Sequence, residues 1–451
     1  MNVKRVLKRI GIVLAISLPF LGVALYFAWD WAAGYGEDMS NANLEIPSPA
    51  ANPPPLESGL TDWPQWKGPS NDNRSLVKNI RTDWSEGLPK LWEIEYLCQD
   101  TPSVAWSCPV VQGNRLVVQG RSKNQDHVFA LDPIAGTLIW HQLFESTSGG
   151  DSYGEGPRSA PTIDDNRVYT VTRGGDVSCW DLLDGKLRWR KNLPILGGAI
   201  PNWGYAASPV VDGDTLLIPA GGQSLLLGFN KHSGDILWQA APGPCSYSTP
   251  VVTELQGRKQ IVYLGGQALF GLDPNNGTEL WQTPWVTGNN INICTPIIDE
   301  NIVVISAGYG KGMKVVKVTD RGPEDLWQGK QIQAHLADPF VLDGYIYGYS
   351  GMSVHNRGTF KCIDLKTGDE HWETKAIGTG SFIHCDPYFV CLDLKGNLFL
   401  VEPNEKTFTL VTQFPKAIDR VRHRSWTKPI LANDRLYLRF VHRLICYEIK
   451  R

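Results

Sequence analysis

The sequence predicts an all-β chain, an eight-bladed β-propeller with four-stranded blades, preceded by one N-terminal transmembrane helix. Three observations predict the propeller. A strand–turn–strand motif that ends in tryptophan recurs along the chain, and a second motif that begins with proline occurs eight times between its copies. Apolar residues after residue 60 alternate with a period of two, which indicates strands rather than helices.

The tryptophan motif consists of a strand, an aspartate, a turn that contains glycine, and a second strand that ends at the tryptophan. Its copies are LDPIAGTLIW at 131–140, WDLLDGKLRW at 180–189, GFNKHSGDILW at 228–238, GLDPNNGTELW at 271–281 and CIDLKTGDEHW at 362–372, with a weaker copy that ends at Trp327. The aspartate bonds to the nearby backbone and the glycine accepts a positive φ. Both residues therefore stand where a tight hairpin requires them.

The proline motif contains a proline, two or three apolar residues, a polar turn and an alternating apolar strand. It begins at Pro109, Pro161, Pro209, Pro250, Pro296, Pro339, Pro387 and Pro429. Successive prolines are 41 to 52 residues apart, which is room for the four short strands of one propeller blade. A β-sandwich with chance similarity is the alternative, and eight copies in phase argue against it.

The two ends of the chain are predicted to close the ring together. The seventh copy of the tryptophan motif has Leu410 where the tryptophan would fall, and the eighth repeat ends with the chain before any such residue. The upstream segment LPKLWEIEY carries Trp92 and supplies the missing strand. Closing the ring in this way removes the unpaired strand edges that an open ring would leave.

The residues just before the eight prolines are predicted to lie around the propeller axis. Two positions before, all are small, as expected where eight strands converge: Ser107, Ser159, Ala207, Ser248, Cys294, Ala337, Cys385 and Thr427. In the last three blades, polar residues gather nearby, and these are the candidate site residues: His335, Asp338, His384, Asp386, His423 and Lys428. Converging Asp and His side chains suit a metal such as Ca²⁺ or Zn²⁺, or acid–base chemistry. Alternatively, the aspartates cap turns and the other residues line a wet channel.

With these motifs, the chain resembles the PQQ-like (pyrroloquinoline-quinone-like) repeat propellers over roughly residues 60–451, and its opening WPQWKGP at 63–69 is similar to the start of many exported bacterial members. In that family the motif tryptophan stacks between neighbouring blades. The resemblance implies this docking role for Trp140, Trp189, Trp238, Trp281, Trp327 and Trp372. The motifs are specific for fold and weak for function.

Two branches of the family imply different functions. Quinoprotein dehydrogenases hold PQQ and Ca²⁺ in the funnel and commonly have a disulfide between adjacent cysteines, whereas none of the nine cysteines here is adjacent to another. The chain looks closer to the eight-bladed scaffold of the outer-membrane assembly machine, which binds partners without a cofactor. We therefore expect a protein-binding or scaffolding module without a cofactor or catalytic residues, PQQ and Ca²⁺ being expected only under the alternative. A quinone-dependent oxidoreductase is the alternative, and a lyase, hydrolase or sugar-binding module stays open.

The N-terminus is expected to anchor the protein. Residues 1–9 form a basic tail, residues 10–29 an uncharged apolar run about as long as a bilayer-spanning helix, and residues 30–60 a Pro/Asn/Ser-rich linker that leads into the propeller at 61–451. Basic residues before the run place the propeller outside the cytoplasm, which predicts a single-pass inner-membrane protein whose propeller lies in the periplasm. A cleaved signal peptide is the alternative.

Composition narrows the partners. The formal net charge is -3, and beyond the first nine residues the basic residues cluster only in the short run RVRHR at 420–424. Nucleic acid is not an expected partner, because phosphate binding needs many clustered Lys and Arg side chains. We expect an envelope protein and, through the N-terminal helix, the membrane. The scattered cysteines form no CxxC pair, so no structural zinc site is expected.

Overall fold

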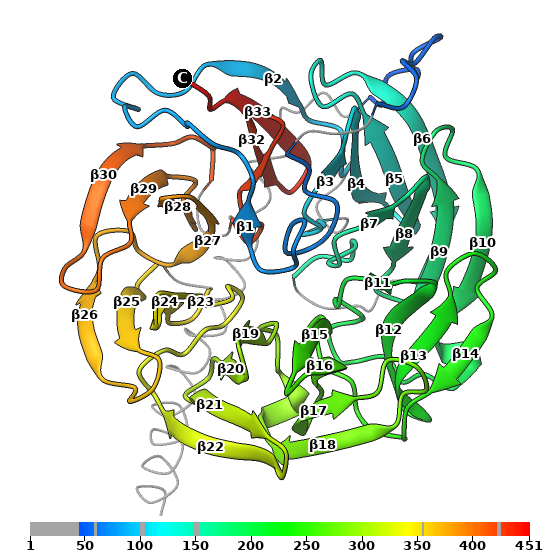
Figure 1. The fold of residues 1–451 in the computed structure, drawn as a ribbon. Coiled ribbons are helices and arrows are strands. Elements are labelled where there is room, and N and C mark those ends of the chain that lie inside the picture. Colours follow the sequence, from blue (N-terminus) through cyan, green and yellow to red (C-terminus); the bar gives the residue numbers. More distant parts are fainter. Residues whose placement is uncertain (1–44, 58–60, 100–103, 148–152, 354–355, 422–424) are drawn as a thin grey trace, which may run out of the picture.

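The computed structural model describes residues 45–57, 61–99, 104–147, 153–353, 356–421 and 425–451. In these ranges the strands form eight separate sheets, which Figure 1 shows arranged as blades around a central axis. The predicted eight-bladed, four-stranded propeller is confirmed. The predicted membrane helix at 10–29 lies outside the described residues. Within the ranges above, no helical segment reaches the length and apolarity that crossing a bilayer requires.

Each blade is an antiparallel sheet whose strands run in order from the axis outward. Blades one to four are β3 (Val110–Gln112), β4 (Arg115–Ser122), β5 (Gln125–Leu131), β6 (Leu138–Glu145); β7 (Thr162–Asp164), β8 (Arg167–Val171), β9 (Asp176–Asp181), β10 (Leu187–Asn192); β11 (Val210–Asp212), β12 (Thr215–Gly221), β13 (Ser224–Asn230), β14 (Ile236–Gln239); and β15 (Val251–Leu255), β16 (Arg258–Leu264), β17 (Ala268–Leu272), β18 (Glu279–Pro284).

Blades five to eight are β19 (Ile297–Asp299), β20 (Ile302–Ala307), β21 (Gly312–Thr319), β22 (Gly322–Gly329); β23 (Phe340–Leu342), β24 (Tyr345–Ser350), β25 (Thr359–Asp364), β26 (Glu370–Thr374); β27 (Gly380–Cys385), β28 (Tyr388–Asp393), β29 (Leu398–Glu402), β30 (Thr409–Phe414); and β31 (Ile430–Ala432), β32 (Arg435–Phe440), β33 (Arg443–Glu448), β2 (Lys90–Ile94). The structure also has β1 (Arg74–Ser75) and the 3-10 helices η2 (Pro194–Leu196) and η3 (Gly288–Asn290).

The tryptophan motif joins each blade to the next. In the first copy the Asp132 carboxylate accepts hydrogen bonds from the backbone N–H groups of Ile134 and Ala135, at 2.7 and 3.0 Å, and Gly136 has a φ of +70°. The indole N–H of Trp140 then donates to the Leu182 carbonyl in the turn of the following blade, at 3.0 Å. The same bond recurs from Trp189 to Lys231, Trp327 to Leu365 and Trp372 to Asn404. These bonds show the inter-blade docking implied by the resemblance for four of the six motif tryptophans, whereas Trp281 donates to Gln260 Oε1 of its own blade and the Trp238 indole N–H has no hydrogen-bond partner among the described residues.

The N-terminal strand completes the last blade, as predicted. Strand β2 pairs antiparallel with β33, and the indole N–H of Trp92 donates to the Pro133 carbonyl of blade one at 3.2 Å. The buried Arg443 guanidinium reinforces the pair, because its Nε donates to the Glu93 carboxylate at 2.7 Å. The seam between the two ends of the chain is thus built like the seams between interior blades.

Residues 61–80 form a second closure that the sequence did not predict, and we call them the plug segment. Trp63 pairs with Val111 of blade one, while β1 adds a fifth, parallel strand to the inner edge of blade seven, with Arg74 opposite His384 and Ser75 opposite Cys385. Figure 1 shows this segment in blue, crossing toward the axis between β27 and β3. The plug segment thereby ties the first blade to the seventh through the channel.

The propeller has two different faces because neighbouring strands run in opposite directions. The loops that lead from the outermost strand of one blade to the innermost strand of the next all emerge on one side, the cup face. The turns of the tryptophan motif emerge on the other side, the turn face. On the turn face, part of the predicted linker contacts blade one, because Ala50 N–H donates to the Leu138 carbonyl and the Pro55 carbonyl accepts from the Asn114 amide.

All nine cysteines lie in the described ranges, and all are buried and without disulfides. They lie on strands or in the segments between them, as Cys179 does on β9 and Cys391 on β28. Burial raises the pKa of the Cys245 and Cys446 thiols to about 12, which keeps both protonated. These side chains act as small core residues.

Candidate functional site

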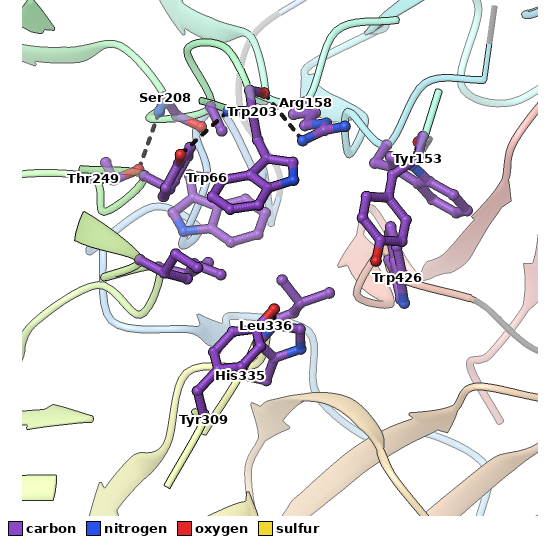
Figure 2. A pocket seen from close by; sticks show the side chains of 15 residues that line it. Trp66, Tyr153, Arg158, Trp203, Ser208, Thr249, Tyr309, His335, Leu336 and Trp426 are labelled. Carbon is purple, nitrogen blue, oxygen red and sulfur yellow. Dashed lines mark hydrogen bonds between the residues drawn. The ribbon is translucent and has the colours of Figure 1, made fainter. Parts of the chain in front are cut away.

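An aromatic cavity of about 160 Å³ opens at the axis on the cup face, and we call it the cup. Fifteen residues line it: Trp66, Trp106, Tyr153, Arg158, Trp203, Ala206, Ser208, Tyr247, Thr249, Ile291, Ile293, Tyr309, His335, Leu336 and Trp426. Figure 2 shows the labelled rings surrounding the open space. Seven of these fifteen are tryptophan or tyrosine, which makes the wall overwhelmingly apolar and flat-faced.

Most of the eight repeats contribute a residue to the cup from the same repeat position, and this position was not among the predicted site positions. Residues three positions before each motif proline are Trp106, Arg158, Ala206, Tyr247, Ile293, Leu336, His384 and Trp426, and seven of these eight line the cup. The exception is His384, which lies within β27 and is paired with β1. Alternation along the chain directs this position into the cup, so the same repeat register would have revealed it.

The plug segment supplies the floor of the cup through Trp66. Its indole N–H donates to Thr295 Oγ1 at 3.2 Å, which fixes the ring from blade five. Beneath the ring, the Lys428 ammonium lies 3.5 Å from the ring centroid and donates to Asn73 Oδ1 at 2.7 Å. A cation over an indole face is attracted by the ring quadrupole. The floor is therefore held by contacts from two other parts of the chain.

The polar atoms of the cup wall are largely engaged within the protein. The indole N–H groups of Trp106 and Trp426 donate to the backbone carbonyls of Tyr153 and Ser353, at 2.9 and 2.6 Å. The Tyr247 hydroxyl accepts a bond from the Trp203 backbone N–H at 3.3 Å. What these residues present to the cavity is consequently their ring faces and edges.

His335 is a neutral member of the wall. Its Nδ1 accepts a hydrogen bond from the Ser353 backbone N–H at 3.1 Å, which leaves the proton on Nε2, 3.2 Å from the Tyr309 hydroxyl. Burial lowers the pKa of His335 to about 4, because desolvation penalises the charged ring. At neutral pH the imidazole therefore brings no charge into the cup.

Residues one position before the motif prolines latch neighbouring blades together below the cup. The Ala160 N–H donates to Ser208 Oγ and the Ser208 N–H to Thr249 Oγ1, each at 3.0 Å. The Thr295 N–H donates to Asp338 Oδ1 at 2.8 Å, while Asp338 Oδ2 is buried without a hydrogen-bond partner. Asp338 thus occupies a structural position that a serine or threonine fills in other blades.

The structure separates the six candidate residues. His335 lines the cup, and Lys428 and Asp338 lie beneath its floor, where burial lowers the pKa of Lys428 to about 7 against the opposing charge of Asp338. Asp386 lies on an exposed turn and pairs with Lys78 at 2.9 Å. His384 stacks on Phe340 with ring centroids 5.2 Å apart.

The sixth candidate, His423, falls outside the described residues. Across the ranges that are described, no three His, Cys, Asp or Glu side chains gather closely enough to hold a metal ion. The candidate set therefore does not form one cluster in the described part of the chain.

Three consecutive loops beside the cup carry no charged residue, and we call them the uncharged sector: residues 193–209, 240–250 and 285–296. Two of them contain strongly exposed apolar side chains, with Ile195 at 85%, Val286 at 58% and Ile200 at 47% relative exposure. Trp203 and Tyr247 connect the sector directly to the cup wall. Large apolar side chains that are exposed beside an apolar cavity, without neighbouring charges in the same loops, are typical of contact sites.

The fold and this site define an eight-bladed propeller of the PQQ-like repeat class with an apolar axial cup. The sequence profile of the family described as outer membrane protein assembly factor BamB matches residues 123–374, more than half of the chain. The chain belongs to this family, and the predicted resemblance to PQQ-like repeat propellers is confirmed.

Individual relatives are distant. The outer membrane protein assembly factor BamB of Moranella endobia (strain PCIT) is 22% identical over 321 residues, which span 66% of this chain and 76% of the relative. The crystal structure of BamB from Moraxella catarrhalis has a TM-score of 0.57 at 16% identity and covers 81% of this chain and 98% of its own. A europium-containing methanol dehydrogenase has a TM-score of 0.63 at 13% identity, covering 84% and 89%. Both solved structures share the fold.

Proposed function

We propose that this chain is a non-catalytic, protein-binding module of the cell envelope that takes part in the assembly of outer membrane proteins. One observation carries the proposal: the loops of the uncharged sector, which expose Ile195, Ile200 and Val286, also supply Trp203, Tyr247 and Ile293 to the wall of the aromatic cup. Membership in the BamB family supports the outer-membrane context.

The composition of this surface suits a protein partner. The buried centres of protein interfaces are depleted in charge and enriched in aromatic residues, and Trp, Tyr and Arg dominate their binding energy. The cup wall supplies Trp203, Trp426, Tyr247 and Arg158, and the sector supplies exposed Ile195. Such residues on a rigid propeller lose little conformational freedom on binding, which favours a stable complex.

The proposal includes the N-terminal anchor at residues 10–29 and a propeller outside the inner membrane. Residues 45–57 contact blade one on the turn face, where Arg115 donates to the Pro54 carbonyl at 2.7 Å. The chain that leads back to the anchor therefore starts from the turn face. In an anchored protein the cup face is on the side of the propeller away from that connection, accessible to a partner.

A quinone-dependent oxidoreductase fits the site less well. A calcium-bound quinone requires several oxygen ligands, which proteins supply chiefly as carboxylate, amide or carbonyl groups. Among the residues that the structure describes, the fifteen that line the cup include no Asp, Glu, Asn or Gln. These residues do not fit a quinone with its calcium ion.

The function is tested by deleting the gene in the source organism and restoring it as wild type or as the double variant Ile195→Asp, Val286→Asp. We expect the wild type to restore outer membrane β-barrel protein levels and the double variant to fail, because two charges interrupt the apolar surface. The matched control is Leu326→Asp, an apolar residue on the outer strand β22 that is 40% exposed. If a folded double variant of normal abundance fully restored the β-barrel protein levels, the proposal would be contradicted.

A further inference from the structure

We propose that the cup binds a single aromatic side chain of the partner protein, which inserts into the cavity as the central anchor residue of the interface. This inference rests on the proposed function and names the chemistry of the partner at that site. It follows from the size of the cavity, the state of its polar atoms and the arrangement of its rings.

The size of the cup selects a ligand of one ring. Its volume is about 160 Å³, and an engineered apolar cavity of roughly 150 Å³ binds one benzene molecule. Sites for drug-sized ligands occupy about 300–1,000 Å³. A multi-ring cofactor or an oligosaccharide exceeds this space, whereas the side chain of phenylalanine or tyrosine fits it.

The polar atoms of the wall are already largely hydrogen-bonded within the protein, which favours an apolar ligand. The indole N–H groups of Trp66, Trp106 and Trp426 all donate to protein acceptors, and the Tyr309 hydroxyl lies 3.2 Å from His335 Nε2. The hydroxyl groups of a sugar entering the cup would give up water without gaining enough partners, which is unfavourable. A phenyl ring has no hydrogen bonds to water that the cup would have to replace.

The mutual orientation of the wall rings suits an inserted ring. Trp106 and Trp426 are tilted by 45° with centroids 4.6 Å apart, and Trp203 and Tyr247 are at 67° with centroids 6.1 Å apart. The cavity is thereby bordered by both ring faces and ring edges. Aromatic pairs prefer edge-to-face and offset contacts at such distances, so an incoming ring finds favourable geometry on several sides.

The occupant is a partner side chain rather than a free small molecule because the loops of the uncharged sector supply part of the cup wall. Trp203 lies in the loop 193–209 that also exposes Ile195, and Ile291 and Ile293 lie in the loop that exposes Val286. A partner segment lying on these uncharged loops meets the cup wall at Trp203 and Ile293. Its ring fills the cup while the flanking residues cover the sector.

The test uses the purified full chain and N-acetyl-L-phenylalaninamide as the probe, followed by saturation-transfer NMR and calorimetry. We expect saturable binding with a Kd of about the millimolar range, given the small size of the probe. N-acetyl-L-asparaginamide and N-acetylglucosamine are expected to bind at least about tenfold more weakly. Ala206→Trp fills the cup from its own wall and is expected to weaken probe binding at least about tenfold, while Leu326→Ala leaves it unchanged.

Each outcome decides the inference. Saturable binding of the phenylalanine probe that Ala206→Trp abolishes supports it, whereas no saturable binding, stronger binding of the sugar, or indifference to Ala206→Trp overturns it. Partner binding separates this inference from the proposed function. If Ala206→Trp keeps the partner and Ile195→Asp, Val286→Asp loses it, only the cup inference fails. If both variants keep the partner, the proposed function fails as well.

Discussion

The indole ring of Trp92 occupies the space where a Cβ atom on Gly136 would lie, because that atom would be 2.7 Å from the ring. Trp92 belongs to the N-terminal strand of blade eight and Gly136 to the turn of blade one. A Cβ atom on Gly185 would likewise lie 2.7 Å from the ring of Trp140, at a seam between two interior blades. Glycine is thus required at this motif position for two reasons: its φ is positive, and a tryptophan ring packs where a Cβ atom would lie.

Gly136→Ala is therefore expected to lower the free energy of unfolding by about 2–4 kcal/mol, from the strained positive φ and the collision with Trp92. Gly213→Ala is the matched control, because Gly213 also has a positive φ of +57° but a Cβ there meets nothing within 4 Å. Its expected cost is about 1 kcal/mol, from backbone strain alone. Urea unfolding of both variants measures the difference, and equal costs would contradict the packing account.

The ring closure also depends on the buried Arg443, which donates to Glu93 on β2 and to the Asp419 carbonyl, the latter at 2.8 Å. Glu93→Gln is expected to lower the free energy of unfolding by about 1–3 kcal/mol, because the buried Arg443 guanidinium loses one of its three carboxylate partners, with Asp419 and Glu95 remaining. Asp386→Asn removes the exposed pair with Lys78, and its expected effect is below about 1 kcal/mol. Thermal melts compare the two, and a larger loss from Asp386→Asn would refute this ranking.

The propeller is expected to lose stability in mild acid. Burial lowers the pKa of five histidines to about 4, from an ordinary value of 6.5: His127, His141, His335, His384 and His442. Between these values the unfolded chain binds more protons than the folded one, so stability falls as pH decreases from about 6.5 toward about 4. Below about pH 4 these histidines cause no further loss.

Denaturant unfolding at pH 7.5, 6 and 5 measures this acid loss. His442→Asn is expected to make the decline shallower by up to about 1.4 kcal/mol per pH unit, the most that one histidine contributes. The control variant is Leu326→Ala, which removes no titrating group, and its decline is expected to match that of the wild type. Constant stability of the wild type across this range would contradict the prediction.

Lys428 predicts a dependence of the same sign at higher pH, where stability again rises with pH. Burial lowers its pKa to about 7, with Asp338 and Cys108 opposing the shift and Lys67 adding to it. The folded chain releases this proton near pH 7 and the unfolded chain near 10.5, so the contribution of Lys428 to stability rises with pH above 7. Lys428→Met is expected to remove this contribution. Melting temperatures at pH 6.5 and 8.5 test it, and an identical pH difference in wild type and variant would disprove it.

The fold was predictable because the residues that recur in its repeat each have a direct geometric role. Asp132, Gly136 and Trp140 form a turn and a docking contact whose spacing can be read without coordinates, and Trp92 at the other end showed how the ring closes. The plug segment was not predictable in this way. Its strand β1 has two residues, and its partners lie far away in the sequence on β27.

The site was predictable only in part. Asp338, Asp386 and Lys428 share one repeat position, but Asp386 is exposed beside Lys78 whereas Asp338 is buried against Thr295. Their different surroundings arise from the plug segment, which adds β1 to blade seven and places Trp66 above Lys428. The cup itself lies two positions earlier in the same repeat, where the alternation of the chain points the side chains toward its opening.

Site-specific photo-crosslinking in the source organism tests most directly whether the cup face binds the partner. One crosslinker replaces Ile195 in the uncharged sector, and another replaces Arg321, an exposed residue in the turn before β22 on the turn face. We expect position 195 to crosslink to an outer membrane β-barrel protein or to a component of its assembly, identified by mass spectrometry, and position 321 to give no such product. Crosslinks to those proteins from position 321 and none from position 195 would contradict the account.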